Sequence, residues 1–381
     1  MPWQKTSSKL IMKKNILLLL LSTLSINWLS AANTPVYIAS AETGIYLSHL
    51  DGQTGSLSKP ELVSNIGGAG FLAKHPTHPY LYATGHIEKG VGCVAAYKIH
   101  SDGKLVEIGK QAAKGKKLCH VSLDATSKVL MVANYSEGNV VSFPLNQDGT
   151  IGKVTSFHKH KGSSVHPTRQ TKPHAHSIYS GPSNKFAYAP DLGIDKIMIY
   201  AIEPDTAKLT HIGFSQSPAG SGPRHMKFGK NGKQAYVLNE LTLSISVFDQ
   251  NPVSGKLTPK QLVSTLPEGA DKTAMSCSEI RVSKDGKFIY CANRNLTETG
   301  RDSISVFSVG GGGKITRIQT IGAEVWIPRN IHLDPSGKWL LVAGQKSNNV
   351  PVFKVDKTTG MLSYTGNKIE IPKAMCIEFG K

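Results

Sequence analysis

Several features that mark common functional classes are missing from this 381-residue chain. It has no run of five or more basic residues and no alternation of basic with aromatic residues, so it does not predict a nucleic-acid interface. It has no GxSxG motif, which argues against a covalent serine mechanism. No long amphipathic helical pattern follows the N-terminal segment, which argues against a helical fold.

Cysteine and acidic residues are both scarce. The cysteines are odd in number and form no CxxC pair, so we expect small buried apolar residues, with a disulfide between Cys277 and Cys291 as the alternative. The 26 acidic residues against 44 basic ones give a formal net charge of +18. Because this excess is spread along the chain, it favours small anionic ligands. The five cysteines are Cys93, Cys119, Cys277, Cys291 and Cys376.

One long apolar run is present, near the N-terminus. The run ILLLLLSTLSI follows four lysines and precedes WLSAAN, the three-part pattern of a secretory signal peptide cleaved near Ala32. It is short for a membrane span, although an uncleaved anchor is the alternative. We therefore predict a signal peptide over residues 1–32, a mature domain over 33–381, and a periplasmic or secreted protein that is not bound to a membrane.

A sequence repeat of about fifty residues recurs along the remaining chain. It reads as an apolar strand, a polar turn, a second strand ending in a polar residue, and two further strands. The period and the short Val-, Ile-, Tyr- and Phe-rich strands are typical of β-propeller blades. Clear copies of its first half are HSIYSGPSNKFAYAPDL, HMKFGKNGKQAYVLNEL, SEIRVSKDGKFIYCANR and RNIHLDPSGKWLLVAGQ.

The two ends of the chain complement each other. VYIASAETGIYLSHL near the start reads as a second and third strand without a first, and PKAMCIEFG at the end reads as a first strand alone. Six copies lie between them, so the ends together predict a seventh blade that closes the ring and removes the open sheet edge. The predicted fold is an all-β, seven-bladed propeller in one domain.

Polar residues recur where each first strand starts and each second strand ends. These two positions meet at one edge of an antiparallel hairpin, so they should gather at one mouth of the central channel. A concave, mixed acid and base set is a candidate ligand site, although polar strand ends also satisfy backbone groups. The positions are His120, Asn134, Tyr135, His176, Asp191, Arg224, His225, Asn239, Glu240, Glu279, Asn293, Arg294, Arg329, Asn330, Gln345 and Lys346.

The segments HPTRQTKPHAHSI, GSGPRHMKF and YVLNELTLSISVF resemble the seven-bladed lactonase propellers. That family includes 6-phosphogluconolactonases and the fungal 3-carboxy-cis,cis-muconate lactonizing enzyme. The resemblance spans the mature chain and implies a metal-independent carboxylic ester hydrolase without a cofactor. It implies a catalytic set of His176, Arg224, Glu240 and Arg294.

The resemblance implies opening of a small anionic lactone. Glu240 and His176 are the candidates for moving a proton, and we favour Glu240 as the base. Arg224 and Arg294 would hold the oxyanion and any carboxylate or phosphate. The export signal fits poorly with a cytoplasmic phosphogluconolactone, so the identity of the lactone stays open.

Two histidines, His174 and His176, share a face of the HAH segment and raise the possibility of a metal. No acidic ligands accompany them, so we predict no metal and assign His174 a supporting, substrate-binding role. The segments 161–172 and 265–276 are predicted to overhang the channel. Within them, Arg169 and Lys172 are interpreted as solvated surface residues, with added anion contacts at the channel as the alternative.

Two other functions stay open. A muconate-type cycloisomerase would use the same four residues, and a non-catalytic propeller would bind a ligand or protein through its loops. The substrate-binding candidates under the lactonase hypothesis are His120, Asn134, His174, Asp191, His225, Asn239, Glu279, Arg329 and Gln345. The oligomeric state is not indicated by the sequence.

Overall fold

The structure, a computed structural model, describes residues 1–4, 33–88, 90–297 and 300–380. The predicted signal peptide falls on residues that lie, after the first four, outside the described ones, so it stays a prediction. Strands dominate the described chain, and its single short 3-10 turn is η1 (Gly311–Gly313). In the described residues no helix has the length and apolar character needed to cross a membrane.

The strands form seven four-stranded antiparallel sheets, as the repeat predicts. The first sheet joins the two ends of the chain, with the order β28 (Ala374–Phe379), β1 (Thr34–Ser40), β2 (Gly44–Leu50), β3 (Glu61–Ser64). The others are β4 (Leu72–Lys74), β5 (Tyr80–Glu88), β6 (Val91–Ile99), β7 (Leu105–Ala112); β8 (Leu118–Leu123), β9 (Val129–Asn134), β10 (Asn139–Pro144), β11 (Ser156–Lys159); β12 (Tyr179–Ser180), β13 (Phe186–Asp191), β14 (Lys196–Glu203), β15 (Lys208–Gln216); β16 (Pro223–Phe228), β17 (Gln234–Asn239), β18 (Ser244–Gln250), β19 (Leu257–Ser264); β20 (Met275–Val282), β21 (Phe288–Asn295), β22 (Ser303–Val309), β23 (Ile315–Gly322); and β24 (Pro328–Leu333), β25 (Trp339–Gly344), β26 (Asn349–Val355), β27 (Leu362–Glu370).

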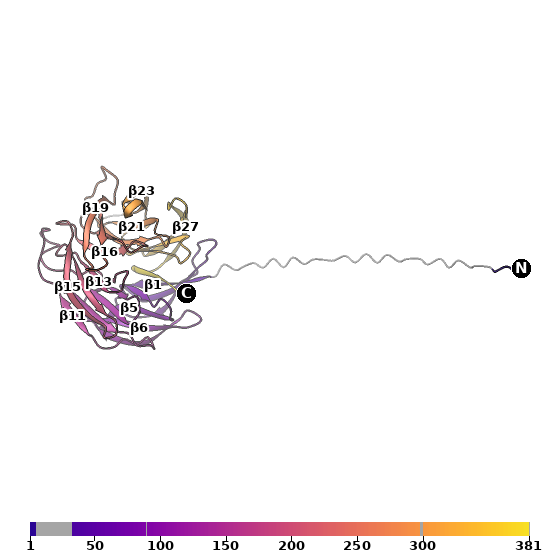
Figure 1. The fold of residues 1–381 in the computed structure, drawn as a ribbon, viewed down its shortest axis with the longest axis horizontal. Helices are drawn as coiled ribbons and strands as arrows, with labels where there is room; N and C mark the ends of the chain where they lie inside the picture. The colour runs from indigo at the N-terminus through magenta and orange to yellow at the C-terminus, as the bar shows by residue number, and fades with distance from the viewer. Residues whose placement is uncertain (5–32, 89, 298–299, 381) are drawn as a thin grey trace. The chain divides into compact units, whose positions relative to one another are not determined.

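The predicted closure of the ring is confirmed. β28 pairs antiparallel with β1, with Val36 opposite Phe379 and Ile38 opposite Ile377, and Figure 1 shows β1 beside the C-terminus. The N-terminal segment supplies the second, third and fourth strands of this blade. Pairing the two ends leaves no inner strand with an open edge, which is how propellers avoid edge-to-edge association.

The first strand of every blade lines the central channel. Rings at or just before several first strands lie close together around it: the ring centre of His120 lies 4.4 Å from that of Phe71 and 5.5 Å from that of His225, and the ring centres of His176 and His225 are 5.2 Å apart. We call the face where the first strands start the upper face. The face that carries the turns between first and second strands is the lower face.

Neighbouring blades are held together by a repeated latch. A tyrosine in the second strand donates its hydroxyl to a glycine carbonyl in a turn of the next blade, and Trp339 does the same with its indole N–H. Gly360 shows why the turn needs glycine: its φ is +75°, and a Cβ there would lie 2.3 Å from Phe288. The donor and acceptor pairs are Tyr37 and Gly103, Tyr82 and Gly149, Tyr188 and Gly255, Tyr236 and Gly313, Tyr290 and Gly360, and Trp339 and Gly52.

One predicted strand is shorter than expected. The segment that starts at His176 was predicted to be a full first strand, but β12 covers only Tyr179 and Ser180. Pro190 in the paired strand has no N–H to donate, so the ladder is interrupted opposite this segment. An isolated bridge between Ala175 and Asp191 resumes the pairing beyond the break.

All five cysteines are free thiols, four of them buried and Cys119 half-buried. Cys277 lies opposite Asn293 and Cys291 opposite Ile280, so the two thiols that could have paired are out of register. The interpretation of the cysteines as small apolar residues is therefore confirmed, apart from the partial exposure of Cys119.

Candidate active site

Three arginines surround one buried carboxylate at the upper face. Arg169 Nη2 lies 2.6 Å from Oε1 of Glu240, and Arg224 Nε lies 2.8 Å from Oε2. Arg294 Nη2 lies 3.2 Å from the same Oε2. The Glu240 side chain is only 5% exposed, so these are close, weakly screened ion pairs.

The topology brings these groups together from different blades. Arg224 lies at the start of β16 and Glu240 directly follows β17, so one hairpin presents both. Arg294 lies near the end of β21 in the next blade, where its Nη2 also donates to the Cys277 carbonyl. Arg224 also donates through Nη1 to the carbonyl of Ser278. Backbone contacts thus fix both guanidinium planes.

The charge state of Glu240 follows from these neighbours. Burial alone would raise the pKa of its carboxyl, but Arg294, Arg224 and Arg169 outweigh burial and hold the pKa well below the ordinary value of 4.5. Glu240 is therefore an ionised carboxylate at any neutral pH. A carboxylate of such low basicity is a poor proton acceptor.

His176 lies beside this cluster. Its Nε2 is 3.9 Å from Oε2 of Glu240, its ring meets the edge of Tyr135 at 5.3 Å, and its Nδ1 has no partner among the described residues. Burial, followed by the positive charge of Arg224, lowers its pKa well below 6.5. The imidazole is therefore neutral at pH 7 and carries a nitrogen lone pair.

A fourth arginine lies nearby without a direct ion pair. Arg329 has no hydrogen bond or ion pair in the described part of the chain. Burial, with the charges of Arg224 and Arg294, lowers its pKa to about 9, so it stays a cation at neutral pH. Together with Arg224 and His225 it lines a cavity of 240 Å³ whose described wall contains no acidic residue.

The other predicted binding residues divide into two groups. Asn134 donates to the Ala113 carbonyl and to Asn139, and Asn239 donates to two serine hydroxyls of its own blade. These amides tie loops and strands together, which is the role open to any polar strand end. The same holds for Asp191, whose Oδ2 lies 2.6 Å from Nδ1 of His160.

His174 has a supporting position. Its ring stacks on Tyr135 at 4.4 Å, its Nδ1 lies 2.9 Å from the Tyr135 carbonyl oxygen, and its N–H donates to Asp191. Because Tyr135 in turn accepts a hydrogen bond from Arg169, His174 holds the aromatic wall beside His176.

The remaining candidates lie inside the channel or at its rim. His225 Nδ1 is 3.0 Å from Oε1 of Glu279, and Oε2 of Glu279 accepts from Asn330 at 2.6 Å. His120 is buried between aromatic rings, and its Nε2 has no partner among the described residues. Gln345, half-buried, directly follows β25. These residues do not contact Glu240 directly.

Arg169 corrects one interpretation from the sequence. It was expected to be a solvated surface residue, yet it makes the shortest contact to Glu240. It lies in the long connection between β11 and β12, where no strand periodicity predicts the direction of a side chain. The one feature of the sequence that could have indicated its role is the prediction that this segment overhangs the channel. Lys172 lies in the same segment and donates to the Ser136 carbonyl.

The described residues contain no group of three or more His, Cys, Asp or Glu side chains placed to hold a metal ion. The polar set at the upper face is rich in guanidinium groups instead. Such a set suits an oxyanion, a carboxylate or a phosphate.

A seven-bladed propeller that gathers arginines, a carboxylate and an imidazole at one channel mouth is a propeller of the lactonase type. The chain belongs to the family of lactonases with a 7-bladed β-propeller, whose model matches residues 35–379. The resemblance inferred from the sequence is thereby confirmed.

Proteins similar to this chain support its assignment to the lactonase family. The 6-phosphogluconolactonase of Bacillus subtilis (strain 168) is 34% identical over 347 residues, which cover 90% of this chain and 96% of the relative. The 6-phosphogluconolactonase of Formosa agariphila is 33% identical, over 84% of this chain and 90% of the relative. Among solved structures, the periplasmic gluconolactonase of Pseudomonas aeruginosa aligns with a TM-score of 0.85 and 27% identity, covering 92% of this chain and 99% of that one.

Proposed function

We propose that this protein hydrolyses a sugar-derived or other anionic lactone at the upper mouth of its channel. The observation that carries the proposal is the surplus of positive charge around Glu240. Three arginines meet this carboxylate, and Arg329 adds a further cation that has no counter-ion in the described structure. Such a surplus favours an anionic ligand and stabilises the oxyanion that forms when an ester carbonyl is attacked.

The free lone pair of His176 favours it as the group that moves the proton, because its Nδ1 has no partner among the described residues, whereas both oxygens of Glu240 accept from arginines. Its neutral imidazole would take a proton from a water molecule while the water oxygen attacks the lactone carbonyl carbon. Arg224 and Arg294 would stabilise the tetrahedral oxyanion. When the ring C–O bond breaks, the protonated imidazole returns its proton to the leaving alkoxide, and the product is a hydroxy acid.

In this mechanism Glu240 does not act as the base, contrary to the preference drawn from the sequence. Its pKa is held too low by the three arginines. Its role is to hold Arg224 and Arg294 in a fixed arrangement and to limit their mutual repulsion, so that both face the reacting carbonyl.

Export is part of the proposal. The N-terminal pattern of residues 1–32 is that of a secretory signal peptide. The similar structure from Pseudomonas aeruginosa is named a periplasmic gluconolactonase, which supports a sugar lactone met outside the cytoplasm. Fractionation of expressing cells, with mass spectrometry of the mature N-terminus, tests this separately: an intact leader in the cytoplasm would contradict it.

The central experiment is a pH-stat assay of the protein with gluconolactone, its 6-phosphate and uncharged aliphatic lactones. We expect acid release above the spontaneous rate for at least one sugar lactone, and loss of this release in His176→Asn. Analysis of the products by NMR separates ring hydrolysis from exchange of a C–O bond with an alkene, the outcome expected of a cycloisomerase. If no lactone is opened faster than by buffer alone, the proposal is wrong.

A further inference from the structure

A second cavity lies at the opposite end of the molecule from Glu240. It has a volume of 330 Å³ and lies among the lower-face turns of three blades, those of β16–β19, β20–β23 and β24–β27. We call it the lower groove. It is lined by Lys230, Ser283, Lys284, Asp285, Phe288, Tyr290, Leu333, Ser336, Gly337, Val355 and Lys357.

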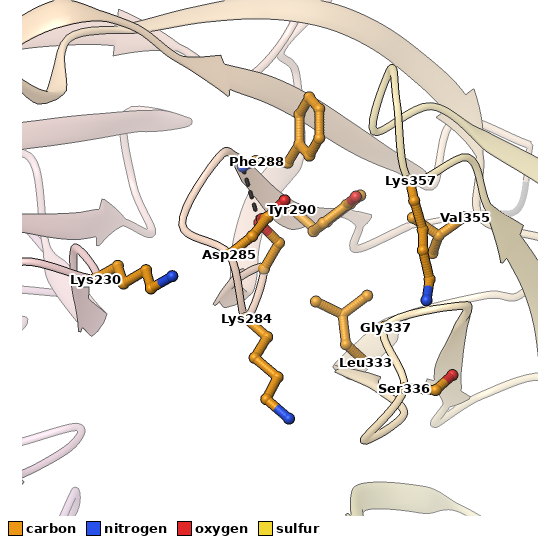
Figure 2. A pocket seen from close by; sticks show the side chains of 11 residues that line it. Lys230, Lys284, Asp285, Phe288, Tyr290, Leu333, Ser336, Gly337, Val355 and Lys357 are labelled. Atoms are coloured by element: carbon orange, nitrogen blue, oxygen red, sulfur yellow. Dashed lines mark hydrogen bonds between the residues drawn. The ribbon is translucent and has the colours of Figure 1, made fainter.

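The floor of the lower groove is apolar. Phe288 is 8% exposed, Tyr290 is fully buried, and Val355 is 6% exposed. Tyr290 lies beneath this floor and uses its hydroxyl in the latch to Gly360, so it offers no open hydroxyl to the groove. Leu333 completes the floor, and Figure 2 shows it opposite Tyr290. A floor of this kind suits a flat apolar body.

The rim of the groove is cationic. Figure 2 shows Lys230, Lys284 and Lys357 around the same opening. All three are exposed, and none has an ion pair in the part of the chain that the structure describes. Other exposed lysines of this protein do pair: Lys104 lies 3.2 Å from Glu61, and Lys373 lies 2.9 Å from Glu42.

Asp285, the acidic residue in the lining, offsets one of the three lysine charges and leaves the rim with a net positive charge. Its Oδ1 accepts from the Ser283 hydroxyl at 2.6 Å and from the Lys287 N–H at 3.1 Å, so its carboxylate is bound within its own turn. An adjoining cavity of 460 Å³ shares Lys230 and Lys284 and leads to the lower mouth of the channel.

That adjoining cavity adds one further cation, Arg281, and a partly charged amine. Lys227 and Arg281 reach it from the first strands together with His332, and burial lowers the pKa of Lys227 to about 7. Lys227 has no ion pair among the described residues, and its ammonium lies 4.2 Å from the ring centre of Tyr179. Glu279 lies 3.6 Å from Arg281 and partly neutralises it, while Asp334 is bound by the backbone of its own turn.

We propose that the lower groove binds an organic anion with an apolar body, of the class of aromatic carboxylates and sulfonates. The body would lie on Phe288, Val355 and Leu333, and the acidic group would lie between Lys230 and Lys284. Exposed ammonium groups hold a small inorganic ion only weakly in water. Burial of an apolar body supplies the remaining affinity. The site is independent of the lactone-opening site.

The test is a fluorescence titration of the protein with anilinonaphthalene sulfonate, whose emission rises in apolar surroundings. We expect saturable binding with one site per chain, and competition by naphthoate at concentrations where sulfate of equal ionic strength does not compete. The double variant Lys230→Glu/Lys284→Glu should weaken binding at least roughly tenfold, because two favourable charges become repulsive.

The matched control is Lys59→Glu/Lys208→Glu, which changes the net charge equally at exposed lysines outside the groove. It should bind the dye like the wild type, and both double variants should keep the wild-type lactone activity. Equal affinity of the two double variants would overturn the proposal. A crystal soaked with a brominated benzoate should place bromine over the apolar floor. If bromine is found only at other places, the benzoate is an adventitious additive only, and this result would also overturn the proposal.

Discussion

Replacing Glu240 by glutamine tests the organisation of the site most directly. The change keeps the shape of the side chain but removes the negative charge that lies 2.6, 2.8 and 3.2 Å from three guanidinium nitrogens. Arg224 and Arg294 are almost fully buried, so water cannot replace the lost charge. We therefore expect a large destabilisation even though no cavity is created.

The magnitude follows from the burial of each pair. Removing one partner of a buried ion pair costs about 3–5 kcal/mol, because the remaining charge is left uncompensated. Arg169 is 33% exposed, so its part is screened and adds little to that figure. Glu268→Gln, at an exposed glutamate in a loop, should change the free energy of unfolding by less than about 0.5 kcal/mol.

The assay is urea unfolding followed by fluorescence, at several pH values and anion concentrations. Because the folded pKa of Glu240 lies below 4.5, its contribution is fully present above that pH and is lost as the pH falls through the folded pKa. The difference in urea midpoint between wild type and variant should thus stay constant from pH 8 to 5 and shrink at lower pH. Gluconate or phosphate at about 100 times its Kd should restore roughly 2.7 kcal/mol.

The reasoning would be refuted by a variant that is as stable as the wild type, since Glu240 would then not be needed to hold the arginines. It would also be refuted if one fixed, subsaturating concentration of phosphate stabilised Glu240→Gln no more than the Glu268→Gln control, because arginines freed from the carboxylate should bind the anion more tightly.

Further predictions concern chemistry and stability. His176→Asn should lower kcat about 10²- to 10⁴-fold with little change in KM, whereas His174→Asn should lower it less than roughly tenfold, and equal losses would contradict these roles. The pH profile of kcat/KM should show no inflection near 6.5, because the pKa of His176 lies well below that value; an inflection there would show that the imidazole titrates normally. Arg329→Met should raise KM about tenfold for a lactone that carries a charge and leave KM for an uncharged lactone unchanged, as steady-state kinetics would show. Tyr236→Phe should lower the free energy of unfolding by about 1 kcal/mol, measured by urea unfolding, because the Gly313 carbonyl loses its donor.

The fold could be predicted because each blade repeats the same local information. Each blade repeats alternating apolar residues, a polar turn and a glycine before the fourth strand. A blade whose sequence has diverged is therefore still recognised by comparison with the other blades. The break before Tyr179 was missed because it depends on Pro190 in the paired strand, and pairing is not visible within the segment itself.

The candidate site was only partly predictable, for a related reason. Strand phase places His176, Arg224, Glu240 and Arg294 at the upper face, and the structure brings these four together. The position of a residue along its strand does not show whether its side chain faces a ligand or hydrogen-bonds within its own blade. Asn134 and Asn239 were therefore predicted to bind substrate, yet their amide N–H groups donate within the protein.

The cations at the upper mouth argue for a ligand-binding role over a purely structural one. The Asn134 amide nitrogen and the Asp191 carboxylate find partners that tie strands and loops, as a scaffold requires, while Asn134 Oδ1 has no partner among the described residues. At the upper mouth Arg329, which is half-buried, makes no ion pair in the described structure, and His176 Nδ1 has no partner there. A partly desolvated cation without an ion pair and an unpartnered imidazole both lower stability, and a bound anion would supply the missing partner. A propeller that served only as a scaffold would gain stability by replacing Arg329 with a neutral side chain.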